Sequence, residues 1–136
     1  MTVRDGVGYK VLLDEAAAQV DSISASELAG QLDDPDLVLI DLRDIRELQR
    51  EGLLGGAVHA PRGMLEFWID PDSPYARPIF QEEKRFVFYC RSDWRSTLAA
   101  AVAMRLGLQR VSHLKGGFSA WKESGFEVVD YTKKEK

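Results

Sequence analysis

The chain contains one cysteine, Cys90, in the stretch YCRSDWRS, between a hydrophobic run and a long alanine-rich segment. Arg91 follows the cysteine directly, and Arg95 stands five positions after it. Cysteine reacts as the thiolate, and neighbouring positive charge lowers the pKa of a thiol from its usual value of about 8.5. Free cysteine is also among the residues most often buried and inert, but an inert thiol has no need of two arginines. The spacing therefore indicates a nucleophile in a site for an anionic substrate.

The segments around Cys90 predict a loop that can hold negative charge. FVFYC has the composition of a buried strand, and a helix is expected over residues 95–106. The backbone N–H groups of the bend between them can form an anion-binding nest, and the helix N-terminus adds free donors with partial positive charge. The hydroxyls of Ser92 and Ser96 can donate to the sulfur or to an oxyanion. Trp94, inside the bend, is expected to project towards the mouth or to pack under the segment MLEFW, narrowing the approach of an acceptor.

Composition limits the possible classes of protein. The 136 residues suit one globular domain, and 45% hydrophobic with 29% charged residues argues against disorder. A net charge of -4 disfavours general binding to nucleic acid or to an anionic membrane. One cysteine cannot form an internal disulfide, and with two histidines it makes a poor set of metal ligands, so we expect no metal and no cofactor.

The compartment can also be inferred from the sequence. Charged residues interrupt the first twenty positions, and the longest apolar run, residues 98–104, is far shorter than the roughly 20 residues that cross a bilayer. Together with the lone thiol, these features predict a cytoplasmic protein in a reducing compartment.

Helical and buried-strand patterns alternate along the chain, which predicts a three-layer α/β domain. Its central, mainly parallel sheet should have about five strands, with helices on both faces. Ser24 and Glu27 have the spacing of a capping box, which marks one helix start. The expected strands are 20–23, 37–41, 57–60, 86–90 and 110–114, and the expected helices are 9–20, 25–33, 43–52, 63–69, 80–85, 95–106 and 118–125. Ligands bind beyond the carboxyl ends of the strands in such sheets, and Cys90 ends one of them.

Other polar residues lie near these strand ends. Asp41 and Arg43 are expected to brace the active-site loop through a charge-assisted hydrogen bond, with a surface ion pair as an equally open alternative. Arg62 can line the mouth of the site, although a solvated side chain is slightly preferred. His59 and His113 receive no role, because a packed or half-exposed histidine is commoner than a catalytic one. The helix face that carries Glu47, Arg50 and Glu51 is interpreted as a solvated surface.

Three segments, in this order, resemble the rhodanese family of sulfurtransferases in its single-domain form. They are LIDLRDIRELQREGLLGGAVHAP, the loop CRSDWRS and the closing segment LKGGFSAWKESGFEV. The resemblance covers residues 22–129, which divides the chain into a helical extension at 1–21, a rhodanese-like domain at 22–129 and a frayed tail at 130–136.

The resemblance implies a rhodanese fold and a persulfide intermediate. The Cys90 thiolate would take the outer sulfur of a donor such as thiosulfate or a persulfide and pass it to a thiol, to cyanide or to a protein acceptor. Backbone N–H groups of residues 91–95 would hold the charge of the persulfide, Arg91 and Arg95 would attract the donor, and Arg95 would also fix the loop. No cofactor is required in this reaction.

The sequence departs from the family pattern at two positions. Asp93 stands where a glycine is frequent, and Leu53 stands where a histidine is frequent. Aspartate adopts a left-handed backbone conformation more readily than most residues, so the turn can survive. If the carboxylate faces the pocket it opposes an anionic donor, and Asp93→Gly should raise thiosulfate turnover. If it faces Arg91 or Arg95, it orders them.

Two other functions remain as alternatives. A cysteine-dependent phosphatase uses a similar anion loop with five residues between cysteine and arginine, but Ser96 occupies the position where that arginine would stand. This makes the phosphatase the less favoured reading. A rhodanese-like carrier or sensing module with little thiosulfate turnover would have the same sequence, and the sequence does not predict the oligomeric state.

Overall fold

A five-stranded, wholly parallel sheet forms the centre of the structure, a computed structural model that describes residues 5–131. The strands run in the order β1-β5-β4-β2-β3, with β1 at Asp21–Ile23, β2 at Leu37–Asp41, β3 at Val58–His59, β4 at Arg85–Tyr89 and β5 at Arg110–Leu114. The continuous apolar runs of β2 and β4 place these two strands inside the sheet, where both of their faces are covered.

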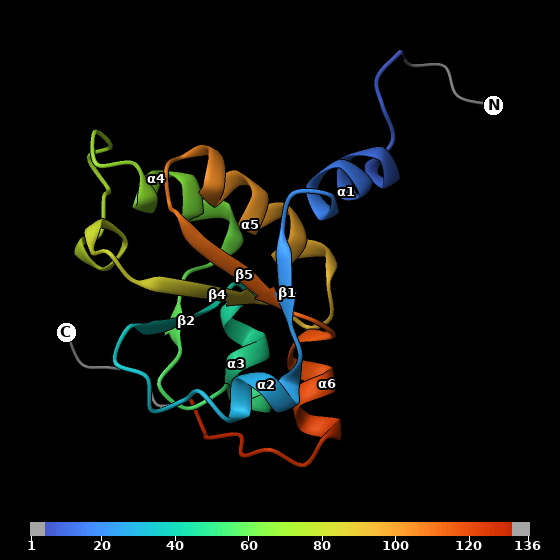
Figure 1. Cartoon of the computed structure of the whole chain (residues 1–136), viewed down its shortest axis with the longest axis vertical. Coiled ribbons are helices and arrows are strands. Elements are labelled where there is room, and N and C mark those ends of the chain that lie inside the picture. The colour runs from blue at the N-terminus through green and yellow to red at the C-terminus, as the bar shows by residue number, and fades with distance from the viewer. Residues whose placement is uncertain (1–4, 132–136) are drawn as a thin grey trace.

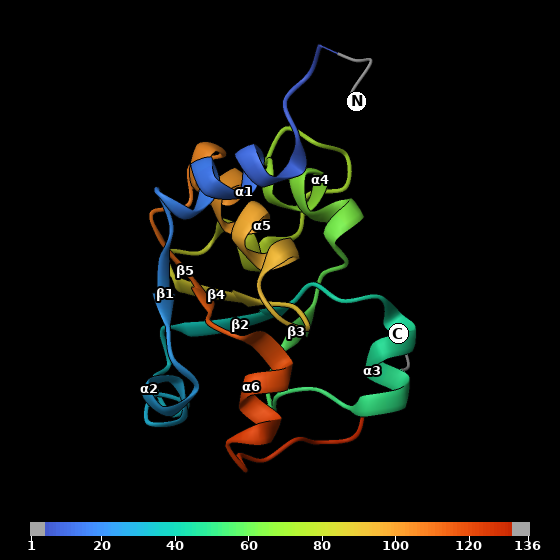
Figure 2. The ribbon, with the colours of Figure 1, turned by 90° about the vertical axis from the view of Figure 1, so that its right-hand side faces the viewer.

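Helices cover both faces of the sheet, so the predicted three-layer α/β architecture is confirmed (Figure 1). One face carries α1 (Tyr9–Ala17), α4 (Leu65–Ile69) and α5 (Trp94–Arg105), and the other carries α2 (Ala25–Ala29), α3 (Ile45–Glu51) and α6 (Gly117–Glu123), as Figure 2 shows. Two short 3-10 helices, η1 (Arg62–Met64) and η2 (Pro78–Gln81), lie in the connection between β3 and β4. No helix among residues 5–131 is long and apolar enough to cross a membrane.

The hydrophobic core consists of two clusters, one on each face of the sheet. Successive residues of a strand point to opposite faces, so Phe86 and Phe88 join the cluster under α4 and α5, while Val87 joins the cluster under α2 and α6. Ala99 and Ala100 of α5 are fully buried, and their small side chains let this helix lie close to the strands. The strand β4, which ends one residue before Cys90, is therefore packed on both of its faces.

Helix starts follow the local sequence. The predicted capping box of α2 is present, because the Ser24 hydroxyl accepts from the Glu27 amide at 3.1 Å and the Glu27 carboxylate accepts from the Ser24 amide at 3.0 Å. A second capping box, formed by Asp44 and Glu47, starts α3 at Ile45. The helix predicted over 43–52 thus begins two residues later, and Arg43 lies outside it.

Other predicted boundaries are wrong. Residues 80–85 do not form a helix: η2 ends at Gln81, and the Arg85 amide already donates to the Asp36 carbonyl at the start of β4. The helix predicted to reach residue 33 ends at Ala29 and continues as turns. Leu53 is buried in an antiparallel bridge with Val129. The first residues of the predicted extension, 1–4, and most of the predicted tail, 132–136, lie outside the described residues.

Arg43 is fully buried where the end of β2 meets α3 and α6. Its guanidinium donates to Asp41 Oδ2 at 2.8 Å and to the Gly52 carbonyl at 2.7 Å, and it lies 4.1 Å from the centre of the Phe118 ring. Burial disfavours the charged form, but the hydrogen bonds and charge of Asp41 outweigh it and raise the pKa of Arg43. The pair formed by Asp41 and Arg43 is therefore an interior feature, and the alternative of a surface ion pair is wrong.

We expect Arg43→Ala to lower the free energy of unfolding by about 3–5 kcal/mol, because it leaves the Asp41 carboxylate buried without its partner. Arg46→Ala is the matched control, since Arg46 pairs with Asp44 on the surface and its loss should lower the free energy of unfolding far less. Urea denaturation of the two variants measures the difference. Equal losses in both variants would contradict a structural role for the buried pair.

Candidate active site

Cys90 directly follows β4 and lies against the first turn of α5. The Ser96 amide donates to its sulfur at 3.4 Å, and the thiol lies 3.6 Å from the Ser96 hydroxyl. The first N–H groups of a helix have no partner within the helix, so one of these free donors is directed at the sulfur. Cys90 exposes only 1% of its surface, which places the sulfur inside the domain and not on its rim.

Backbone contacts with α6 fix the loop of residues 90–93. The Phe118 amide donates to the Cys90 carbonyl at 2.8 Å, and the Ser119 amide donates to the Arg91 carbonyl at 3.0 Å. Gly117 has a φ of +60°, and a Cβ atom there would lie 2.5 Å from the carbonyl oxygens of Cys90 and Ser92. Only glycine allows this approach, which gives the second glycine of LKGG a physical reason.

Asp93 adopts an arrangement that neither sequence alternative included. Its φ is -132°, so the turn does not use the left-handed conformation. Its carboxylate accepts from the Gly116 amide at 2.8 Å and binds neither Arg91 nor Arg95. Asp93→Gly would remove this hydrogen bond together with the charge, and the rise in thiosulfate turnover stays a prediction.

Both arginines of the loop are paired with glutamates of α3. Arg91 Nη1 lies 2.8 Å from both carboxylate oxygens of Glu51, and Arg95 donates to Glu47 at 2.8 and 3.2 Å. Hydrogen bonds from Arg95 and Arg91 hold the pKa of Glu47 and Glu51, respectively, below the usual value. Both glutamates are therefore ionised at neutral pH and balance the positive charge of the loop. The interpretation of this α3 face as a solvated surface is therefore wrong for Glu47 and Glu51, whereas Arg50 is exposed as predicted.

The buried Arg43 connects to the same loop through Glu51. Arg43 Nη1 lies 3.3 Å from Glu51 Oε1, the oxygen that also binds Arg91. The brace that was expected directly between Asp41, Arg43 and the loop thus runs through a glutamate of α3.

His113 contacts the Ser96 hydroxyl, which in turn lies against the Cys90 sulfur, although no role was predicted for this histidine. Parallel pairing of β4 with β5 sets it opposite Phe88, two residues before Cys90. Its Nδ1 atom lies 3.2 Å from the Ser96 hydroxyl. Burial lowers the pKa of His113, an effect that the charge of Asp93 partly opposes, so the ring is neutral at pH 7. The sequence did place His113 near the carboxyl end of a predicted strand, where ligands bind in such sheets. It did not show that this strand lies beside the strand that leads to Cys90.

The remaining candidates lie further from the sulfur or face outward. Trp94 is exposed and packs its ring against Tyr9 of α1 at 5.0 Å between centroids, so it does not pack under the segment MLEFW. The Ser92 residue is also exposed. Arg62 pairs with Glu66 at 3.0 Å on the neighbouring turn, and this ion pair does not include the loop.

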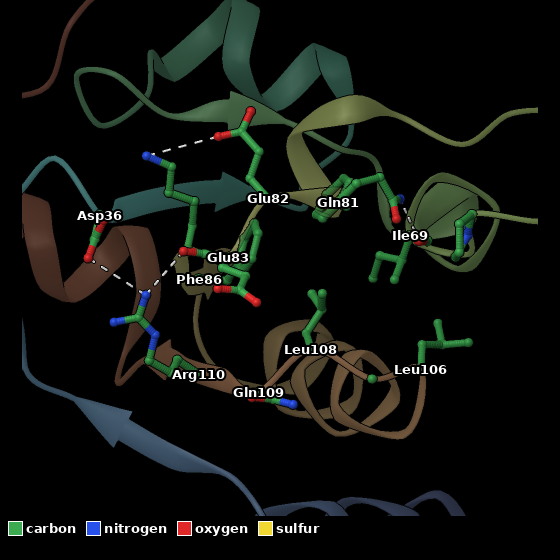
Figure 3. Close-up of a pocket in the computed structure, with 14 residues that line it drawn as sticks. Asp36, Ile69, Gln81, Glu82, Glu83, Phe86, Leu106, Leu108, Gln109 and Arg110 are labelled. Atoms are coloured by element: carbon green, nitrogen blue, oxygen red, sulfur yellow. Dashed lines mark hydrogen bonds and ion pairs between the residues drawn. The ribbon is translucent and has the colours of Figure 1, made fainter.

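A separate pocket of about 610 Å³ lies at the amino ends of β4 and β5, the opposite end of β4 from Cys90 (Figure 3). Two ion pairs lie in this pocket: Arg110 lies 3.7 Å from Asp36, and Lys84 lies 3.9 Å from Glu82. The residues that line the pocket include no cysteine, serine, threonine, tyrosine or histidine. The candidate active site is therefore the loop at Cys90.

Two known proteins are similar to this chain over most of its length. A sulfurtransferase of Allochromatium vinosum is 31% identical over 111 residues, covering 81% of this chain and 95% of that protein. The tRNA uridine(34) hydroxylase of Cronobacter sakazakii is 29% identical, but the match spans 98% of this chain and only 36% of the hydroxylase.

A solved structure and a family description also match. The structure comes from Rhodopseudomonas palustris, has 44% identity and a TM-score of 0.90, and covers 95% of this chain and 99% of that chain. It is described as a protein of unknown function and a possible tyrosine phosphatase. The family description, rhodanese-like domain, matches residues 24–124, most of the chain and the whole segment from α2 to α6. With its buried cysteine at the end of β4, the chain therefore belongs to the rhodanese-like domain family.

Proposed function

We propose that the protein is a sulfurtransferase that carries a sulfane sulfur as a persulfide on Cys90. The observation that carries the proposal is the contact between the Cys90 sulfur and the free Ser96 amide in the first turn of α5. Such a donor stabilises a thiolate before reaction and a leaving thiolate after it. The relationship to named sulfurtransferases supports the same reaction class.

The reaction consists of two displacements. The Cys90 thiolate attacks the outer sulfur of a donor, a new S–S bond forms, and the donor's own S–S bond breaks, so that sulfite or a thiolate leaves with the bonding electrons. A thiol, cyanide or a protein thiol then attacks the outer sulfur of the persulfide, and the Cys90 thiolate leaves. These steps need no cofactor, because the sulfur is carried covalently. A reducing setting such as the cytoplasm suits a protein that works through a free thiol.

The charge balance of the loop bears on the choice of donor. Arg91 and Arg95 are already paired with Glu51 and Glu47, so little free positive charge remains for the doubly charged thiosulfate. This balance favours a persulfide donor of lower charge, small or on a protein. A carrier that receives sulfur and passes it to a protein acceptor, with little thiosulfate turnover, is consistent with the same balance.

A phosphatase is the second candidate, because the related structure from Rhodopseudomonas palustris is described as a possible tyrosine phosphatase. Its loop chemistry would need an arginine that is free to bind phosphate oxygens. Here Arg95 is bound to Glu47, and the next residue is the buried Ser96. The geometry thus favours sulfur transfer.

Mass spectrometry of the intact protein tests the proposal. After exposure to thiosulfate or to a small persulfide, we expect the wild-type chain to gain one sulfur, which cyanide removes and which Cys90→Ser abolishes. Thiosulfate:cyanide turnover measured beside persulfide uptake separates an enzyme from a carrier. A wild-type chain that stays unmodified with every donor, or that hydrolyses an aryl phosphate in a Cys90-dependent way, would reject sulfur transfer.

A second prediction concerns the paired arginines. Glu51→Gln frees the charge of Arg91, so we expect the rate of Cys90 alkylation by anionic iodoacetate, relative to neutral iodoacetamide, to rise about threefold at low salt and less at high salt. Because both reagents need the same access, their ratio isolates charge. Asp34→Asn, which frees Arg85 near the amino end of β4, is the matched control and should leave the ratio unchanged. A ratio unchanged in Glu51→Gln would show that the pair does not screen the sulfur.

A further inference from the structure

His113 is a buried titratable residue that the two displacements do not use. Its ring lies at the end of β5, beside the end of β4 and the first turn of α5. Only 8% of its surface is exposed, so it is not a surface residue that happens to face the loop. A nucleophilic thiol needs a group that accepts its proton, and His113 is positioned for that task.

A continuous chain of contacts joins the ring to the sulfur. The Cys90 thiol lies 3.6 Å from Ser96 Oγ, and Ser96 Oγ lies 3.2 Å from His113 Nδ1. The three groups come from three separate segments, namely the residue after β4, the first turn of α5, and β5, and all three residues are buried. The serine hydroxyl can accept a proton from the thiol while it donates its own to the imidazole. Its competing contact, with the Asp93 carbonyl, is also 3.2 Å long.

The charges around the ring suit a proton acceptor. Burial lowers the pKa of His113, so the ring is neutral at pH 7, and in the tautomer that carries its proton on Nε2 the Nδ1 atom can accept. The charged group that faces it is Asp93, whose carboxylate lies 4.0 Å from Nδ1 and is held in place by the Gly116 amide. The strand positions paired with His113 are Ser22 on β1 and Phe88 on β4, which carry no charge. A proton on the ring would thus lie beside a carboxylate that is already fixed.

We propose that His113 takes the proton of the Cys90 thiol through the Ser96 hydroxyl, which produces the thiolate that the proposed sulfur transfer requires. The S–H bond breaks and its proton passes to Ser96 Oγ, while the original hydroxyl proton passes to His113 Nδ1. The electron pair stays on the sulfur, so the products are a thiolate and an imidazolium, and no oxidant or reductant is involved. His113 acts through Ser96 and does not touch the substrate.

The test is the pH dependence of Cys90 alkylation by iodoacetamide, which reports the thiolate fraction of the single cysteine. We expect His113→Asn to move the midpoint of the profile upward by about one pH unit and to slow alkylation at pH 7 about tenfold, because asparagine can bind Ser96 but cannot take a proton. Ser96→Ala should shift the midpoint at least as far, and the double variant no further than Ser96→Ala alone.

Two variants serve as controls. Ser96→Thr keeps the hydroxyl, so its midpoint should lie closer to that of the wild type than the midpoint of Ser96→Ala does. His59→Asn removes the other histidine, which binds the Arg43 carbonyl and not Ser96, and should also leave the profile unchanged. Circular dichroism establishes that each variant is folded. If His113→Asn does not fold, the comparison of Ser96→Ala with Ser96→Thr decides the question.

An unshifted midpoint in folded His113→Asn, or independent shifts that add in the double variant, would overturn the relay. Because alkylation needs no sulfur donor, this result is independent of the persulfide experiment. Shifted midpoints without any persulfide would retain the relay and reject sulfur transfer. Persulfide formation with unshifted midpoints would retain sulfur transfer and reject the relay.

Discussion

The buried guanidinium of Arg43 is the interaction on which the other contacts of the site depend. It binds Asp41 at the end of β2, the Gly52 carbonyl at the end of α3, and the ring of Phe118 in α6. A buried charge is costly unless all its partners are in place, so this pair does more to select one arrangement of the three elements than to add stability. Glu47 and Glu51 of α3 pair with the two loop arginines, and amides of α6 bind the loop carbonyls. The position of Arg43 therefore decides where both sets of contacts to the loop lie.

The loop itself is fixed by its backbone more than by its side chains. Its carbonyls are bound by amides of α6, and Gly117 permits this close contact. The same contacts explain why an aspartate is tolerated at position 93. Its backbone is not left-handed, and its carboxylate binds the amide of Gly116 in the same turn. A departure from the family pattern has thus become part of the connection between the loop and α6.

The sequence correctly predicted the structural features that depend on residues close to one another along the chain. The apolar runs of β2 and β4, the Ser24 capping box and the alanine-rich α5 were all found where expected. Contacts between distant segments were missed. Arg91 and Arg95 bind glutamates 40 and 48 positions earlier, and nothing local in the sequence shows that α3 lies against the loop. His113 was missed because its role depends on β5 lying beside β4, and a pattern of apolar residues does not give the order of strands.

These long-range contacts change the source of the thiolate's stabilisation. The sequence suggests that two arginines supply it, but in the folded chain each arginine already has a carboxylate partner. In the proposed reaction, the stabilisation of the thiolate therefore comes from short-range groups, namely the Ser96 amide and hydroxyl at the sulfur and the imidazole that contacts this hydroxyl. A thiolate formed beside an imidazolium adds no net charge to the buried site, whereas a lone thiolate would pay the full cost of desolvation. In the proposed reaction, the α3 glutamates and His113 therefore meet the same requirement. The glutamates balance the charge of the loop arginines, and the histidine balances the charge of the buried thiolate.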